Sequence, residues 1–141
     1  MSARRYLGDT SALSRFSAND KIRAAWAGHL ADGLIGVCPI TELEIFFSAQ
    51  STSHRDSMEN TLESYCPWVT VPEQVFRRAR EVQNSMFQRG THRSAGPVDL
   101  LVAATAELQG LTMLHYDRDF VKIAEVTGQE VQWLAEPGSI D

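Results

Sequence analysis

Cysteine and lysine are scarce in this sequence, and several common site motifs are missing. The two cysteines of the 141-residue chain, Cys38 and Cys66, form neither a CxxC pair nor a set of disulfides. Two free thiols are typical of a reducing compartment, so we expect a cytoplasmic protein. Lys21 and Lys122 are the only lysines, which gives little support to lysine-based covalent catalysis. The sequence contains no GxGxxG, Walker, HExxH or GxSxG motif, which argues against the sites that these motifs build.

Long apolar runs are also absent. The longest, Leu34–Ile40 and Leu100–Ala106, fall far short of the roughly 18 to 20 residues of a membrane helix. Gly8 and Asp9 interrupt the region where the apolar stretch of a secretory signal would begin. We therefore expect no membrane partner. A hydrophobic content of 43% and a charged content of 22% exclude a disordered chain, and the length predicts a single domain over residues 1–141.

Positive charge is in the minority, with a net charge of −5, so the overall charge does not indicate nucleic-acid binding. The arginines are nevertheless clustered between residues 77 and 93. Those of the predicted helix could bind RNA phosphates, but Arg77 is also spaced to pair with Glu73 and Glu81. Arg89, His92 and Arg93, in the loop that follows, are better candidates for contacts with substrate.

Short apolar runs alternate with longer amphipathic segments along the chain. We expect strands at 6–8, 34–38, 68–71, 111–115 and 130–133. We expect helices at 10–17, 19–30, 40–49, 53–65, 72–88, 97–110 and 117–127. This alternation predicts an α/β fold with a parallel sheet covered on both faces, and sites in such folds lie at the carboxyl ends of the strands.

Acidic residues fall where the predicted strands end or the following helices begin. They are Asp9, Glu42, Glu44, Asp99, Asp117 and Asp119. Two carboxylates about 4 Å apart repel each other by about 4 kcal/mol at an effective dielectric constant near 20. A divalent cation removes that repulsion, and oxygen ligands without Cys or His favour Mg²⁺ or Mn²⁺.

Each acid also has a simpler interpretation. Asp9, Asp117 and Asp119 could cap helices, and Asp99 could be an ordinary acid of a first helical turn. Glu42 and Glu44 lie about 200° apart around a helix, so they cannot both face one site. Periodicity alone does not choose between them.

Four segments in this order resemble the PIN-domain ribonucleases, in particular the VapC-type toxins of bacterial toxin–antitoxin pairs. They are Leu7–Ser11 (LGDTS), Ile40–Ala49 (ITELEIFFSA), Pro97–Ala106 (PVDLLVAATA) and His115–Phe120 (HYDRDF). The resemblance covers nearly the whole chain. It implies a three-layer α/β/α PIN-like domain with a short central parallel sheet of four to five strands.

The resemblance also implies roles for individual residues. The catalytic acids would be Asp9, Glu44, Asp99, Asp117 and Asp119, with Asp9, Asp99 and Asp117 holding the metal. Glu44 is favoured over Glu42 because it immediately precedes the apolar pair in its segment. Ser11 would orient Asp9 or the substrate phosphate, and Arg118 would contact phosphate or balance the neighbouring acids. His115 departs from the Thr, Ser or Asn that is commoner there.

The function implied is a Mg²⁺-dependent endoribonuclease, with Mn²⁺ as a substitute, that cuts structured RNA such as a tRNA or rRNA loop. A VapB-type antitoxin would be its partner, and a homodimer is common in the family. Phe46 and Phe47 could form a surface for such a partner. The main alternative is a non-catalytic PIN-like domain that binds RNA or a partner. A phospho-accepting signalling domain is a poor fit, because Asp9 has no acidic neighbour and Lys122 lies within a predicted helix.

Overall fold

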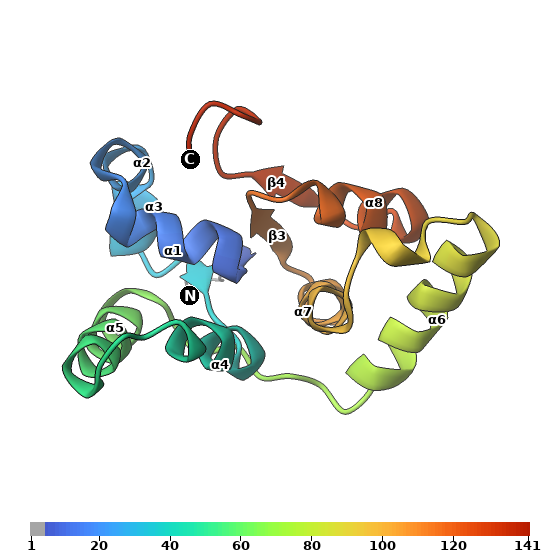
Figure 1. Ribbon diagram of the computed structural model, residues 1–141, viewed down its shortest axis with the longest axis horizontal. Helices are drawn as coiled ribbons and strands as arrows, with labels where there is room; N and C mark the ends of the chain where they lie inside the picture. The colour runs from blue at the N-terminus through green and yellow to red at the C-terminus, as the bar shows by residue number, and fades with distance from the viewer. Residues whose placement is uncertain (1–4) are drawn as a thin grey trace.

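A four-stranded parallel sheet lies at the centre of the protein (Figure 1), whose structure is a computed structural model describing residues 5–141. Its order is β2-β1-β3-β4. The strands are β1 (Tyr6–Gly8), β2 (Ile35–Gly36), β3 (Thr112–His115) and β4 (Val131–Trp133). Leu7 of β1 lies between Gly36 of β2 and Met113 of β3, and all three pairings are parallel. The prediction of an α/β fold with a parallel sheet is confirmed.

Helices cover both faces of this sheet. On one side lie α1 (Thr10–Ala18), α2 (Asp20–Ala25), α3 (Ala27–Ala31), α4 (Pro39–Phe47) and α5 (Thr52–Tyr65). On the other lie α6 (Val75–Gln88), α7 (Pro97–Leu108) and α8 (Arg118–Thr127), with the 3₁₀ helix η1 (His92–Ser94) between α6 and α7. The three-layer arrangement follows from the strands, because Met113 and Leu114 are both fully buried but belong to apolar clusters on opposite faces.

The helices α6, α7 and α8 pack through the stripes that the sequence shows. Val75, Ala79, Val82 and Met86 of α6 are all buried, as their spacing of three or four residues predicts. The helix α7 is buried along most of its length, as expected for a helix that is apolar almost all round. Because α7 leads back to the start of β3, its N-terminal end lies at the carboxyl end of the sheet.

Two predicted elements differ in the structure. Residues 68–71 form no strand, since only a single bridge joins Trp68 to Val37. Pro67 and Pro72 lack backbone N–H groups on either side of this segment, and Trp68 is 55% exposed. The helix predicted over 19–30 divides into α2 and α3 at Trp26, whose indole Nε1 donates to the Leu134 carbonyl across the fold.

No helix among the described residues is long and apolar enough to cross a membrane.

Candidate active site

Asp9 occupies the turn between β1 and α1, where it caps the helix. Its Oδ1 accepts hydrogen bonds from the Ala12 backbone N–H at 3.2 Å and from the Ser11 hydroxyl at 2.7 Å. The Ser11 oxygen also accepts a hydrogen bond from the Tyr116 backbone N–H at 2.8 Å. Tyr116 directly follows β3, so Ser11 links the Asp9 carboxylate to the end of the neighbouring strand. Of the two roles predicted for Ser11, this geometry favours orienting Asp9.

Asp117 occupies the corresponding turn between β3 and α8. Its Oδ1 accepts the Asp119 backbone N–H at 2.9 Å, which makes it the N-cap of α8. The Asp117 N–H in turn donates to Nδ1 of His115 at 3.2 Å. His115 is fully buried between the rings of Phe120 and Trp133. Asp9 and Asp117 are therefore helix caps, and capping also fixes their carboxylates at the edge where the strands end.

Asp99 brings the acids together, because it projects from the first turn of α7 into the same region. Burial raises its pKa to about 7, with further increases from the negative charges of Asp119, Asp9, Asp117 and Glu44. Its carboxyl group is therefore within electrostatic range of all four. We call these five residues the acidic site: Asp9, Glu44, Asp99, Asp117 and Asp119.

The acidic site holds its negative charge without a basic partner. None of the ion pairs found between residues 5 and 141 involves its five carboxyl groups. Asp9 is 6% exposed, and burial raises its pKa to about 6 despite the opposing hydrogen bonds from Ser11. Burial and the charge of Asp117 also raise the pKa of Asp119. The guanidinium of Arg118 lies over the ring of Trp133, at 6.0 Å from its centre.

The two glutamates of α4 are separated by their partners. Thr10 Oγ1 donates to Glu44 Oε1 at 2.9 Å, which ties Glu44 to the residue after Asp9. Glu42 Oε1 instead accepts from the Trp68 indole N–H at 3.0 Å. Glu44 thus lies by the other acids, and Glu42 is turned to a different surface. The role of Thr10 was not visible in the sequence, because 34 positions separate it from Glu44.

The chemistry of these side chains fits a hard divalent cation. The donors are carboxylate oxygens. The raised pKa values of Asp9 and Asp99 show that their charged forms are disfavoured, and a bound cation would stabilise those forms. No three Asp, Glu, His or Cys side chains within residues 5–141 are arranged to hold a metal by themselves. Mg²⁺ does not require such a cage, since it usually keeps several waters and binds through one or two carboxylates and substrate phosphates.

The clustered arginines have different environments. Arg78 pairs with Glu107, at 2.6 Å between Nε and Oε1, and with Glu81 at 3.3 Å. Arg77 has no ion pair with any described residue, so the pairing predicted with Glu73 and Glu81 does not form. Arg89 directly follows α6 and Arg93 lies in η1, and both are exposed and have no ion pair to the described residues.

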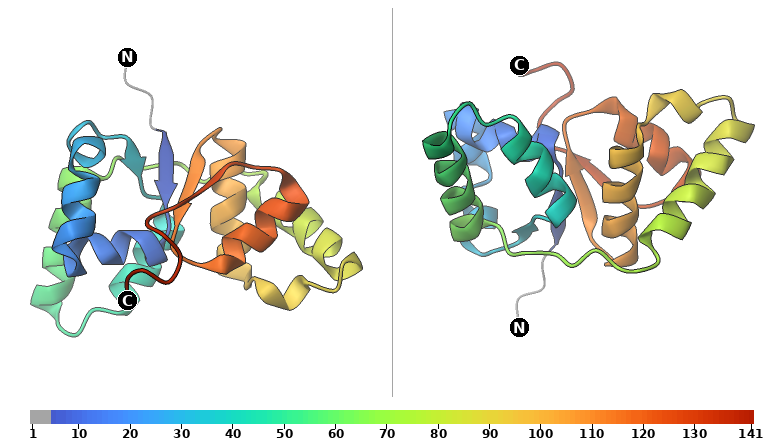
Figure 2. Two further views of the ribbon diagram at one scale, coloured as in Figure 1. Left: turned by 90° about the horizontal axis from the view of Figure 1, so that it is seen from above. Right: turned by 60° about the horizontal axis from the view of Figure 1, so that its bottom comes forward.

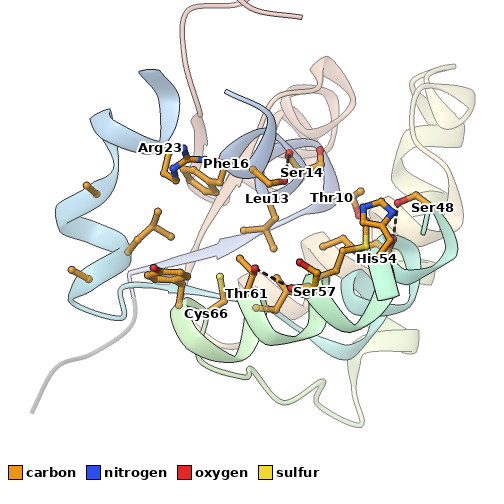
Figure 3. A pocket seen from close by; sticks show the side chains of 18 residues that line it. Thr10, Leu13, Ser14, Phe16, Arg23, Ser48, His54, Ser57, Thr61 and Cys66 are labelled. Atoms are coloured by element: carbon orange, nitrogen blue, oxygen red, sulfur yellow. Dashed lines mark hydrogen bonds between the residues drawn. The ribbon is translucent and has the colours of Figure 1, made fainter. Parts of the chain in front are cut away.

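A cavity of about 580 Å³ opens beside the acidic site, between α1, α3, α4 and α5 (Figure 3). We call it the apolar pocket. Its apolar lining consists mainly of Leu13, Phe16, Leu30, Ile45, Met58 and Leu62. Thr10 lies at one end of it, near Ser48 and His54. Because Thr10 also holds Glu44, the apolar pocket adjoins the acidic site.

Comparison with known proteins agrees with this geometry. The PIN domain family matches residues 6–126. Ribonuclease VapC2 of Mycobacterium tuberculosis (strain CDC 1551) is 40% identical over 136 residues, covering 95% of both chains. Ribonuclease VapC21 of M. tuberculosis (strain H37Rv) is 36% identical over 135 residues, covering 96% of this chain and 97% of that protein.

Solved structures show the same fold. A chain of the DNA-bound VapBC complex from Salmonella typhimurium superposes with a TM-score of 0.75 at 17% identity, covering 94% of this chain and all of that one. A chain of DNA-bound VapBC2 from Rickettsia felis gives a TM-score of 0.73 at 14% identity, covering 91% and 97%. Together with the family match, these similarities show that the chain belongs to the PIN domain family and to its VapC type.

Proposed function

We propose that this protein is a Mg²⁺-dependent endoribonuclease and the toxin of a type II toxin–antitoxin pair. The observation that carries the proposal is the position of Asp99, whose carboxyl group is in electrostatic range of Asp9, Glu44, Asp117 and Asp119. A cluster of acids without a basic partner, one of them the buried Asp9, destabilises a fold unless a ligand compensates the charge. The names of the VapC relatives identify the reaction class that such a cluster would serve.

In this proposal Asp9, Asp99 and Asp117 hold the cation together with water molecules and the substrate phosphate, and Mn²⁺ can take the place of Mg²⁺. The chemistry that the cation supplies when bound is activation of water and stabilisation of charge at the scissile phosphate. Ser11 holds Asp9 in position, and Thr10 does the same for Glu44. The chain's own contribution is therefore positioning and electrostatics, without a covalent nucleophile.

The proposed substrate is a structured RNA, such as a loop of tRNA or rRNA. Arg89 and Arg93 support this, because they are exposed, have no ion pair to described residues and stand before α7. Along with His92 and Arg118, they would contact the RNA backbone or bases near the cut.

The proposed protein partner is a VapB-type antitoxin. The similar chains from Salmonella and Rickettsia belong to structures named as VapBC complexes. The apolar pocket supports a helix-in-groove contact, in which the apolar face of a partner helix packs on Leu13, Phe16 and Met58. Since the pocket ends at Thr10, a chain leaving it would pass over the acidic site and block RNA in the cytoplasm.

We also propose that the protein forms a homodimer through α4. Leu43 is 71% exposed and Phe47 91% exposed, and they lie one helical turn apart on either side of Glu44. Phe46 is half-buried beneath the guanidinium of Arg55, so the outer surface belongs to Phe47. Sedimentation velocity should show a dimer that Phe47→Ser dissociates, whereas an unchanged dimer would place the interface elsewhere.

The experiment that tests the main proposal is cleavage of total RNA by antitoxin-free protein, with and without Mg²⁺, followed by mapping of the new ends. We expect discrete, metal-dependent products that Asp99→Asn does not form. Folded wild-type protein that cuts nothing in Mg²⁺ or Mn²⁺ would favour the alternative, a non-catalytic PIN-like domain that binds RNA or a partner. Equal cleavage by the Asp99→Asn variant would contradict the assignment of the acids.

A further inference from the structure

Phe87 and His92 form a pair of stacked rings where α6 meets η1. The ring centres are 3.7 Å apart and the planes differ by 6°. Phe87 is 56% exposed, so much of its ring faces solvent while His92 covers part of it. His92 Nδ1 is buried and has no hydrogen-bond partner among the described residues. The stacking contact, rather than a hydrogen bond from Nδ1, holds the imidazole ring against Phe87.

The stacked pair lies at the end of the molecule that carries the acidic site. The helix α7 begins at the carboxyl end of the sheet with Asp99 in its first turn, and α6 packs against it. In the left view of Figure 2, α6 ends and η1 lies on the side towards which the arrow of β1 points. The acidic site and the stacked pair therefore lie towards the same end of the molecule, where one RNA strand would meet both.

The surroundings of the stacked pair favour a polyanion. No acidic residue occurs between Val82 and Val98, whereas this stretch contains Arg89 and Arg93 without ion pairs to described residues. The exposed neighbours of Phe87 along α6, including Gln83, Asn84 and Gln88, are polar. The other exposed ring of α6, Phe76, lies about three turns away, so the two rings do not form the continuous apolar patch that a protein partner buries.

We propose that the open face of Phe87, backed by His92, is a stacking site for an unpaired base of the RNA substrate. The proposal rests on the proposed function and adds a contact that would hold the RNA substrate near the cleavage site. An aromatic ring next to arginines is the arrangement by which single-stranded nucleic acid is bound, because every base has a π face and every nucleotide a phosphate. This site would favour RNA with a flipped-out or looped base.

The test is equilibrium binding of a fluorescent 12-nucleotide oligoadenylate, and of an abasic oligomer of equal length, to antitoxin-free protein in EDTA. We expect Phe87→Leu to weaken oligoadenylate binding about 5- to 100-fold, and to leave binding of the abasic oligomer unchanged. Phe87→Trp should restore the preference for bases. Phe76→Leu is the matched control, since Phe76 is 67% exposed near the start of the same helix.

Several outcomes would overturn the stacking site. They are unchanged oligoadenylate binding by Phe87→Leu, an equal loss for both oligomers, or the same loss in Phe76→Leu. Loss of antitoxin binding by Phe87→Leu with RNA binding intact would assign the pair to a protein contact instead. Cleavage of total RNA in Mg²⁺, measured in parallel, separates the two proposals. A wild type that cleaves RNA while Phe87→Leu binds normally refutes only the stacking site, and a wild type that neither cleaves RNA nor binds either oligomer refutes both.

Discussion

The acidic site and the apolar pocket adjoin each other at Thr10, but each lacks a different kind of partner. In the acidic site, the buried carboxyl group of Asp9 and the more exposed carboxyl groups around it repel one another and have no basic partner among the described residues. In the apolar pocket, side chains such as Leu13 and Met58 face a cavity of about 580 Å³. The first lacks positive charge and the second lacks apolar contacts. If the proposed function is right, the acidic site takes a cation with RNA and the apolar pocket takes an apolar polypeptide, and the two ligands compete where the regions meet.

The largest effect should come from Asp99→Asn, which keeps the shape of the side chain and removes the charge that all the other acids approach. We expect RNA cleavage to fall by about 10³-fold or more, in line with the loss of a preorganised electrostatic group. Initial rates of cleavage with saturating Mg²⁺ measure the effect. Glu42→Gln is the control, because Glu42 bonds to Trp68 outside the site.

Antitoxin binding separates the two regions further. Asp99→Asn should keep most of its affinity for the antitoxin, since Asp99 does not line the apolar pocket and only the segment passing over the acidic site would meet the changed side chain. The contradicting outcome for the cleavage experiment is an Asp99→Asn variant that cleaves RNA at the rate of the wild type, which would show that Asp99 has no part in catalysis.

A charge in the apolar pocket should have the opposite pattern. Met58→Lys places an ammonium group where an apolar helix would pack, and should weaken antitoxin binding about 100-fold. Its metal-dependent cleavage of RNA should match the wild type. Ser64→Lys carries the same charge at an exposed position of α5 that does not line the pocket, and should bind normally. Calorimetric titration with the antitoxin measures the affinity of both variants. Equal affinities for Met58→Lys and the wild type would exclude the apolar pocket as the antitoxin's binding site.

Ser11→Ala tests the link between Asp9 and the end of β3. The change removes the hydroxyl that donates to Asp9 and leaves the Tyr116 N–H without its acceptor. A backbone group left unpaired costs about 1–3 kcal/mol of unfolding free energy, and we expect cleavage to fall about 10-fold as Asp9 loses its orientation. Urea unfolding and cleavage rates give the two values. Ser17→Ala, which removes an exposed hydroxyl that bonds to the Ser14 carbonyl, should change neither value.

The smallest effect concerns pH and stability in the absence of metal. The pKa of Asp9 is raised to about 6 and that of Asp99 to about 7, both above the value of 3.8 for an exposed Asp. Between pH 4 and 7 the folded state therefore binds more protons than the unfolded state, so the free energy of unfolding falls as pH rises. Mg²⁺ should offset that loss by binding only the folded protein.

Asp9→Asn is the variant that isolates this charge, because Asn caps a helix as well as Asp does. At pH 7.5 in EDTA its melting temperature should exceed that of the wild type by about 3–8 °C. The difference should shrink towards pH 4 and on adding Mg²⁺ to the wild type. Scanning calorimetry at both pH values provides the measurement. Identical melting temperatures at pH 7.5 would show that the buried charge of Asp9 carries no cost.

Much of this protein was determined locally and could be predicted from the sequence. Alternating apolar runs and helix signals placed every strand of the sheet, and Asp9, Asp99 and Asp117 were recognised because each follows a strand or starts a helix. The strand predicted at 68–71 was wrong, because strand formation needs a partner in register and only Val37 provides a contact. Trp68, the first residue of that predicted strand, has its ring half exposed beside Glu42.

Only the tertiary structure decided the contacts between distant segments. Periodicity left Glu42 and Glu44 undecided and only the family resemblance favoured Glu44, because the contacts that separate the two, with Thr10 and Trp68, come from other parts of the chain. The exposure of Phe87 depends on where η1 turns back after α6. Periodicity reports which face of a helix is apolar, because that is a property of neighbouring residues. It does not report what the other faces meet, because that depends on how helices pack across the sheet.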